Sequence, residues 1–114
     1  MTKTIFEKIL DQTIPADIVY EDHDTLAFKD ISPVAPIHIL VIPKKKIISI
    51  GDMTEDDIEI VGKILHTAKK VADLMDLKKN GFRIVLNTGN DGGQTVPYLH
   101  AHVLGGRRLD WPPG

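Results

Sequence analysis

Cysteine is absent from this sequence of 114 residues, and so is any long apolar run. A chain without cysteine holds no disulfide and no thiolate metal ligand, which makes the cytoplasm its expected location. No apolar run approaches the roughly 18 residues of a membrane span. Residues 1–12, MTKTIFEKILDQ, also lack the apolar stretch and cleavage site of a secretory signal. We therefore expect a cytoplasmic protein without a membrane partner.

An excess of positive charge is lacking too. The 14 Lys and Arg residues are outnumbered by 16 Asp and Glu residues, and the net charge is −2. Nucleic-acid binding depends on many basic contacts to phosphates, so no nucleic-acid partner is expected. There is no repeat or linker, and the length is that of one ordinary domain, which we place at residues 1–114.

Hydrophobic periodicity predicts two helices. Residues 3–10 form a short amphipathic helix. A long helix is predicted from about Glu55 to Leu77, after a capping box of Thr54 and Asp57 and before the terminating KKNG segment. Its apolar stripe contains Ile58, Val61, Ile64, Leu65, Ala68, Val71, Ala72 and Met75.

Five strands are predicted between and after these helices. They cover residues 18–20, 25–28, 37–43, 82–87 and 97–104. No regular helical crossovers join them, so we expect an α+β fold with a mainly antiparallel sheet covered by the long helix.

The last predicted strand carries two histidines. Side chains alternate along a strand, which places Tyr98, His100 and His102 on one face, opposite the apolar Leu99 and Val103. One interpretation is a set of satisfied polar residues on a half-exposed sheet. The other is a nucleophile beside a proton donor, because histidine titrates near neutrality. A metal site is not expected, since zinc needs about three protein ligands and the next acid is Asp110.

The preceding loop, NTGNDGGQT, is rich in glycine. Glycines let main-chain N–H groups approach an anion, although on their own they indicate only a tight turn. Asn87 and Thr95 add hydrogen-bonding groups at its two ends, so loop and histidines together favour a phosphate site. Upstream, His38 is typical of a packed core histidine, and Asp30 either caps its loop or accepts sugar hydroxyls.

Several motifs along the chain resemble the histidine-triad (HIT) superfamily, in its histidine-triad nucleotide-binding (HINT-like) branch. In order they are TIFEKI, LAFKDISPVAP, HILVIPKK, NTGNDGGQTV, LHAHVLGGR and WPPG. The resemblance implies a five-stranded antiparallel sheet with one long and one short helix, extended to ten strands across a homodimer. It also implies a purine nucleotide-binding hydrolase that cleaves AMP or GMP from amine or acyl groups through a nucleotidyl-histidine, without a cofactor.

The resemblance assigns site residues by position. His100 is the nucleophile, His102 and Thr95 assist at the phosphate and leaving group, and His38 lies behind the nucleophile. The implied nucleotide contacts are Phe6, Ile9, Phe28 and Ile31 for the base, Asp30 for the ribose, Asn87, Gly93 and Val96 for the phosphate, and Trp111 near the partner's site.

One position departs from the signature His-φ-His-φ-His-φ-φ, where φ is apolar. Tyr98 stands at the first histidine, which in the family supports the ring network around the nucleophile. Two alternatives to the phosphoramidase-type hydrolase stay open. Tyr98 would fit a non-catalytic or much slowed purine nucleotide-binding module, and a sister branch of the family suggests a dinucleoside polyphosphate hydrolase.

Overall fold

The computed structural model describes residues 2–114, so Met1, the first residue of the predicted domain, lies outside the described part. Its elements are α1 (Ile5–Leu10), β1 (Ile18–Glu21), β2 (Thr25–Lys29), β3 (Ile37–Pro43), the 3-10 turns η1 (Ile50–Asp52) and η2 (Glu55–Asp57), α2 (Ile58–Leu74), β4 (Phe82–Leu86) and β5 (Ala101–Gly105). Within residues 2–114, no helix is both long and apolar enough to cross a bilayer.

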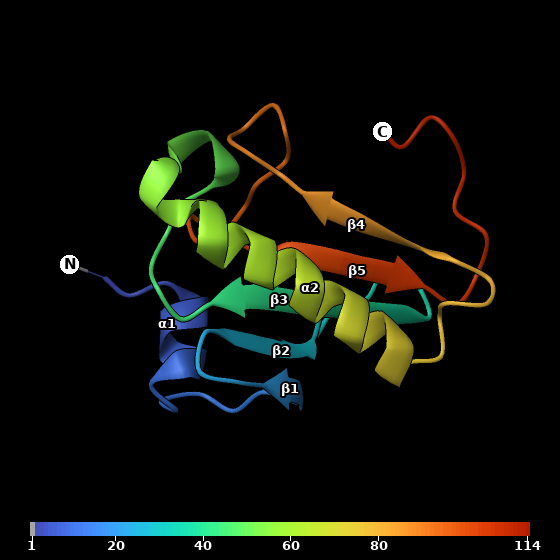
Figure 1. Ribbon diagram of the computed structural model, residues 1–114, viewed down its shortest axis with the longest axis horizontal. Helices are drawn as coiled ribbons and strands as arrows, with labels where there is room; N and C mark the ends of the chain where they lie inside the picture. The colour runs from blue at the N-terminus through green and yellow to red at the C-terminus, as the bar shows by residue number, and fades with distance from the viewer. Residues whose placement is uncertain (1) are drawn as a thin grey trace.

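The five strands form one antiparallel sheet in the order β1-β2-β3-β5-β4 (Figure 1). The last strand, β5, is therefore inserted between β3 and β4. This insertion sets Leu40 of β3 opposite His102, and His38 opposite Leu104. The predicted α+β fold, with a five-stranded antiparallel sheet and one long helix, is confirmed.

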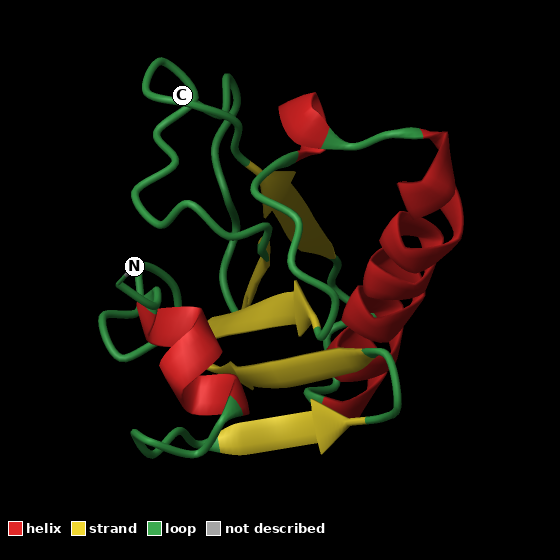
Figure 2. Cartoon of the chain, turned by 90° about the vertical axis from the view of Figure 1, so that its left-hand side faces the viewer, coloured by secondary structure: helices red, strands yellow, loops and turns green. Residues whose placement is uncertain are grey.

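The two helices cover opposite faces of the sheet (Figure 2). On the α2 face the buried cluster is Ala27, Ile39, Val41, Ile47, Ile64, Ala68, Val71, Ala72, Leu77, Leu99, Ala101 and Val103. On the α1 face it is Phe6, Ile9, Leu26, Phe28, Leu40, Ile42 and Tyr98. A capping box of Thr4 and Glu7 starts α1 and helps to aim Phe6 and Ile9 at the sheet. Both faces of β3 are thus buried, as its continuous apolar sequence indicates.

The long helix is shorter than predicted at both ends. Residues Glu55–Asp57 form η2, and α2 ends at Leu74 rather than near Leu77. The chain turns at Asp76, which has a φ of 58°. The N–H of Leu77 bonds back to the carbonyl of Ala72 at 2.9 Å, and that of Asp76 to the carbonyl of Asp73 at 3.1 Å. Asp76 therefore takes the left-handed position at the helix end that we had assigned to the KKNG segment.

The apolar stripe of α2 is only partly buried. Ile58 is 63% exposed and Leu65 is 43% exposed, so these two predicted core residues face away from the sheet. Thr67 is buried instead, because its hydroxyl pairs with that of Thr25 at 2.8 Å. A polar side chain with a partner takes a place on the covered face of the helix.

The last strand starts later than predicted. Residues 97–100 are irregular, and the ladder begins at Ala101. Their N–H groups bond elsewhere, with Tyr98 donating to Val96 at 2.8 Å and Leu99 donating to the Ile47 carbonyl at 2.7 Å. Pro97 has no N–H to offer. The predicted alternation nevertheless persists, since Leu99 belongs to the α2-side cluster and Tyr98 to the α1-side cluster.

Candidate active site

His100 and His102 lie side by side at the start of β5. Their ring centroids are 4.9 Å apart, with the rings inclined at 62°. Phe6 of α1 meets the ring of His100 edge to face, with centroids 4.9 Å apart. His100 is buried and His102 is half-buried. The pair therefore lies on the α1 side of the sheet, where β5 emerges between its two neighbours.

The ring of His100 is fixed by a main-chain carbonyl. Its Nδ1 lies 2.7 Å from the carbonyl oxygen of Tyr98. A carbonyl only accepts, so Nδ1 carries the proton and Nε2 keeps a lone pair. No buried side-chain nitrogen or oxygen in residues 2–114 lacks a hydrogen-bond partner, and Nε2 of His100 has none there. Nε2 is therefore not completely buried and keeps some contact with solvent, which a nucleophile needs.

Both rings are neutral near pH 7. Burial lowers the pKa of His100, although its bond to Tyr98 and the Asp30 carboxylate act in the opposite direction. Burial also lowers the pKa of His102 to about 4, with repulsion from His100 and His38 adding to the shift. A neutral His100 retains the lone pair that attack on an electrophile requires.

Tyr98 takes part through its main chain rather than its side chain. The hydroxyl donates a hydrogen bond to the carbonyl of Pro43 at 2.5 Å, and the ring packs edge to face on Phe6. Burial raises the pKa of the phenol to about 12, with the charge of Glu7 acting in the same direction. The hydroxyl is therefore neither a base nor a partner of the two histidines.

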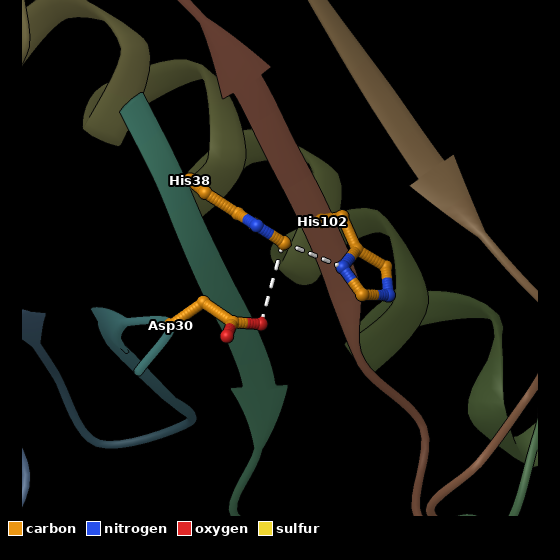
Figure 3. Close-up of side chains that lie close together, drawn as sticks. All are labelled: Asp30, His38 and His102. Atoms are coloured by element: carbon orange, nitrogen blue, oxygen red, sulfur yellow. Dashed lines mark hydrogen bonds and ion pairs between the residues drawn. The ribbon is translucent and has the colours of Figure 1, made fainter. Parts of the chain in front are cut away.

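Behind the pair, Asp30 of the loop after β2, His38 of β3 and His102 of β5 point toward one another (Figure 3). Nε2 of His38 lies 2.9 Å from Nδ1 of His102 and 3.4 Å from Oδ2 of Asp30. The other oxygen of Asp30 accepts the N–H of Ser32 at 2.7 Å, so this residue also caps its own loop. His38 is buried, as expected for a core histidine, yet it contacts the site directly.

These three side chains offer ligand atoms that all lie within 4.8 Å of one another, close enough to consider a metal ion. The tautomer of His38 opposes it. Nδ1 of His38 accepts the N–H of Val34 at 3.1 Å, so the proton of the neutral ring is on Nε2. A metal-bound histidine instead donates from its second nitrogen. The nitrogen of His38 that faces the cluster has no lone pair to give.

The glycine-rich loop is held in one shape by its own contacts. Gly93 has a φ of 83°, and its N–H donates to the carbonyl of Asn90 at 3.0 Å. At Gly92 a Cβ would lie 2.5 Å from the carbonyl oxygen of Thr88, so only glycine fits. The Gly93 N–H therefore has a main-chain acceptor within the loop itself.

The side chain of Gln94 holds this loop in place through three hydrogen bonds, a role that the sequence analysis does not predict. Its side-chain oxygen accepts the N–H of Gly89 at 3.0 Å. Its amide nitrogen donates to the carbonyls of Ile48 at 2.7 Å and Val96 at 3.0 Å. A glutamine in a polar loop normally indicates an exposed surface residue, so the sequence contains no signal for this role.

The other predicted phosphate-side residues border the loop. Leu86 pairs with Ala101, so Asn87 and His100 each stand one residue beyond the last pair of their strands. Thr95 is exposed, and Val96 packs against the α1-side cluster. The structure therefore brings both ends of the loop to the end of β5 that holds the histidines.

An apolar cavity of about 160 Å³ opens beside Asp30. Its lining is Ile5, Ile9, Ile14, Pro15, Ala16, Phe28, Lys29, Asp30, Ile31 and Leu40. Three of the four predicted base contacts line it, and Ile31 stands at the rim, 90% exposed. Phe6 lies outside the lining, between Phe28 and His100. Ile14, Pro15 and Ala16 were not foreseen, because they come from an irregular segment.

The tail and a second, wider cavity lie elsewhere. A cavity of about 620 Å³ between the end of α2 and the tail has no histidine in its lining and borders the α2-side cluster. Arg83 of β4 holds the tail through the carbonyl of Asp110 at 2.9 Å. Trp111 is 81% exposed. Within one chain, the structure does not bring Trp111 to His100.

The fold agrees with that of proteins similar in sequence. The HIT domain profile matches residues 11–109, and the chain belongs to this family. An uncharacterised HIT-like protein of Synechococcus elongatus is 53% identical, over 97% of this chain and 96% of its own length. A 14 kDa zinc-binding protein of Zea mays is 49% identical, over 97% of this chain and 88% of its own. The crystal structure of a HIT family hydrolase from Legionella pneumophila covers 98% of this chain and all of its own, with 48% identity and a TM-score of 0.95.

Proposed function

We propose that this protein is a purine nucleotide-binding hydrolase of the phosphoramidase type, which cleaves AMP or GMP from amine or acyl groups. The observation that carries the proposal is the ring of His100, whose Nε2 is open and keeps its lone pair because Nδ1 donates to Tyr98. The name of the Legionella relative, a HIT family hydrolase, supports a hydrolytic reaction.

The surroundings of His100 suit the parts of a nucleotide. The 160 Å³ apolar cavity has room for a fused-ring base rather than a whole nucleotide, and Asp30 at its edge suits ribose hydroxyls. The phosphate would then lie against His102 and Asn87, at the end of the braced loop. Thr95 is exposed at the far end of that loop and makes no side-chain hydrogen bond within the described residues, so it is free to meet the leaving group.

The chemistry takes two displacements at the α-phosphorus. The lone pair of His100 Nε2 forms a bond to phosphorus, while the bond to the leaving amine breaks and the amine keeps the electron pair and takes a proton from solvent. Water then attacks phosphorus, releases a proton and returns the lone pair to His100. The net products are the amine and the nucleoside monophosphate. Positioning and charge stabilisation by fixed donors lower both barriers.

The hydrolase is favoured over a non-catalytic binding module by the state of the histidine network. Tyr98 replaces a histidine, yet His100 is held by a main-chain carbonyl and His102 by His38. Neither contact uses the side chain at position 98, so a binding module without turnover is the weaker reading. The maize relative is named a zinc-binding protein, which suggests a metal-dependent activity as another possibility. The proton on Nε2 of His38 argues against it, because that nitrogen has no lone pair for a metal ion.

A homodimer is part of the proposal. The edge strand β4 bonds only to β5, and all of its residues keep some exposure. Ile58 and Leu65 leave an apolar stripe uncovered on α2. An open strand edge and a bare apolar stripe are features that a second copy would cover. Joining two β4 edges would give ten strands and bring Trp111 of each chain toward its partner.

The test is turnover of adenosine 5′-phosphoramidate, with AMP release measured beside three variants. His100→Ala should abolish turnover, yet bind AMP and keep the circular dichroism of the native protein. His23→Ala is the matched control, because its side chain is 97% exposed in a distant turn. Unchanged hydrolysis by His100→Ala would end the proposal. Hydrolysis that appears only in Tyr98→His, with AMP bound by the native protein, would establish the binding-module alternative.

A further inference from the structure

The tautomer of His38 decides that of His102, because the two rings share one hydrogen bond. Nε2 of His38 holds the proton of its ring, since Nδ1 accepts the Val34 N–H at 3.1 Å. That Nε2 lies 2.9 Å from Nδ1 of His102 and donates to it. A nitrogen that accepts a hydrogen bond carries no proton, so neutral His102 holds its own proton on Nε2.

His100 and His102 are thus held in opposite tautomers. His100 keeps its proton on Nδ1, facing the Tyr98 carbonyl, and presents a lone pair. His102 presents an N–H, because its proton is on Nε2. This nitrogen has no partner within residues 2–114, and no completely buried side-chain nitrogen there lacks one, so Nε2 of His102 keeps some contact with solvent. Two adjacent rings of the same residue type therefore offer a nucleophile and a hydrogen-bond donor, each set by a different main-chain group.

We propose that the relay from the Val34 N–H through His38 makes His102 a permanent hydrogen-bond donor toward the reacting phosphate, not a proton donor. The main-chain N–H of residue 34, whatever its side chain, and the ring of His38 then position His102. The relay itself follows from contacts within this chain, and only its meeting with a phosphate rests on the proposed function.

The neighbours of His102 oppose both a gain and a loss of a proton. A second proton would go on Nδ1, directly against the N–H of His38, and repulsion from His100 adds to this cost. Loss of the Nε2 proton would draw the proton of His38 across the shared bond. That transfer would place a negative charge 3.4 Å from the Asp30 carboxylate. Two like charges at that distance repel each other. The leaving group must therefore take its proton from solvent.

The decisive experiment reads the tautomers directly. A long-range ¹⁵N–¹H correlation spectrum of the native protein near neutral pH identifies which ring nitrogens carry protons. Protons on Nε2 of His38 and His102, and on Nδ1 of His100, are expected. A proton on Nδ1 of His102 would overturn the relay. The measurement needs no turnover, so its failure and a failure of the hydrolase proposal are distinguishable.

A pair of substitutions isolates the role of the Val34 peptide. Val34→Pro removes the N–H, whereas Val34→Ala keeps it, and the side chain itself is 63% exposed. In Val34→Pro, His38 is free to change tautomer, so signals of a second His102 tautomer should appear and kcat should fall about tenfold. Val34→Ala should show neither change. A folded Val34→Pro with native tautomers and native kcat would overturn the proposal.

A second pair of substitutions, at His38, tests the relay if the Val34→Pro variant does not fold. The side-chain amide of His38→Gln still donates toward His102, whereas His38→Leu offers no donor. The glutamine variant should keep Nε2 of His102 protonated and retain kcat at least about fivefold better than the leucine variant. Equal losses of kcat with the same His102 tautomer in both variants would show that His38 only fills space.

Discussion

The hydroxyl of Tyr98 donates a hydrogen bond to the main-chain carbonyl of Pro43, at a distance of 2.5 Å. This bond ties the irregular segment before β5 to the end of β3. The same residue offers its own carbonyl to Nδ1 of His100. Tyr98 therefore orients the ring of His100 through its main chain, while its side chain packs in the buried cluster beneath α1.

Tyr98→Phe should separate these two contributions. The variant loses only the hydroxyl and leaves the buried Pro43 carbonyl without that partner, so the free energy of unfolding should drop by about 1–2 kcal/mol. The main-chain carbonyl remains, so kcat should change less than about threefold. Urea denaturation and turnover of the phosphoramidate check both values. A large loss of kcat at unchanged stability would assign the phenol itself to catalysis.

Gln94→Glu should loosen the phosphate loop. The substitution replaces the amide nitrogen that bonds to the carbonyls of Ile48 and Val96 with an oxygen that repels them. If the loop positions the phosphate, as proposed above, KM should increase about tenfold and kcat should change less. Asn90→Asp is the matched control, since it adds the same charge to the same loop without touching those bonds. Similar KM values in both variants would contradict the bracing role.

Stability should decrease as pH falls from about 6.5 toward about 4, the range between the ordinary pKa of His102 and its value in the fold. In that range the unfolded chain binds a proton that the native chain does not bind, so acid favours unfolding. The full shift corresponds to about 3 kcal/mol, which solvent screening of the half-buried ring reduces to roughly 2 kcal/mol. Below that range this histidine causes no further loss. Urea midpoints across the range should slope less in His102→Asn. Identical slopes in the two proteins would contradict the burial of a neutral ring.

Leu65→Lys should produce monomers if the bare stripe of α2 lies in a dimer interface. A lysine at its centre would have to be buried without a partner. Light scattering at micromolar concentration should report a dimer for the native protein and a monomer for the variant. Ile18→Lys alters an apolar residue of similar exposure on the opposite edge strand and should stay dimeric. A native monomer would refute the interface.

Treatment with a strong chelator should leave turnover unchanged. Nε2 of His38 holds a proton and offers no lone pair to a metal ion. The relevant measurement is kcat before and after EDTA treatment and dialysis. Lost activity that returns on addition of Zn²⁺ would show that the cluster of Asp30, His38 and His102 holds a metal after all.

Local periodicity predicted much of the fold. The alternation along residues 97–104 correctly separated the two faces, because a period of two survives even where the ladder bonds are missing. The stripe on α2 was less reliable. A periodic pattern identifies the apolar face of a helix, but it does not show how much of that face the sheet buries. Ile58 and Leu65 belong to the predicted stripe, yet the sheet leaves both of them exposed.

The arrangement behind the histidines could not be predicted from the residues alone. His38 and His102 are 64 positions apart, and they meet because β5 inserts beside β3. Nothing local in the sequence fixes that strand order. The groups that orient the rings are main-chain atoms of Val34 and Tyr98, and every residue type has such atoms. The side chains in a sequence therefore indicate the chemistry of a site, but they do not predict the main-chain contacts that set its geometry.

The position of β5 between β3 and β4 also determines the order in which the sheet can form during synthesis. During synthesis β4 emerges from the ribosome before the strand that it pairs with, and β3 waits with one edge open through the whole of α2. Long-range pairing of this kind is slow and leaves open edges at risk of aggregation. Insertion of β5 then completes the sheet and brings His102 beside His38 in the same step. A chain in which β5 has not yet inserted therefore lacks the assembled histidine site.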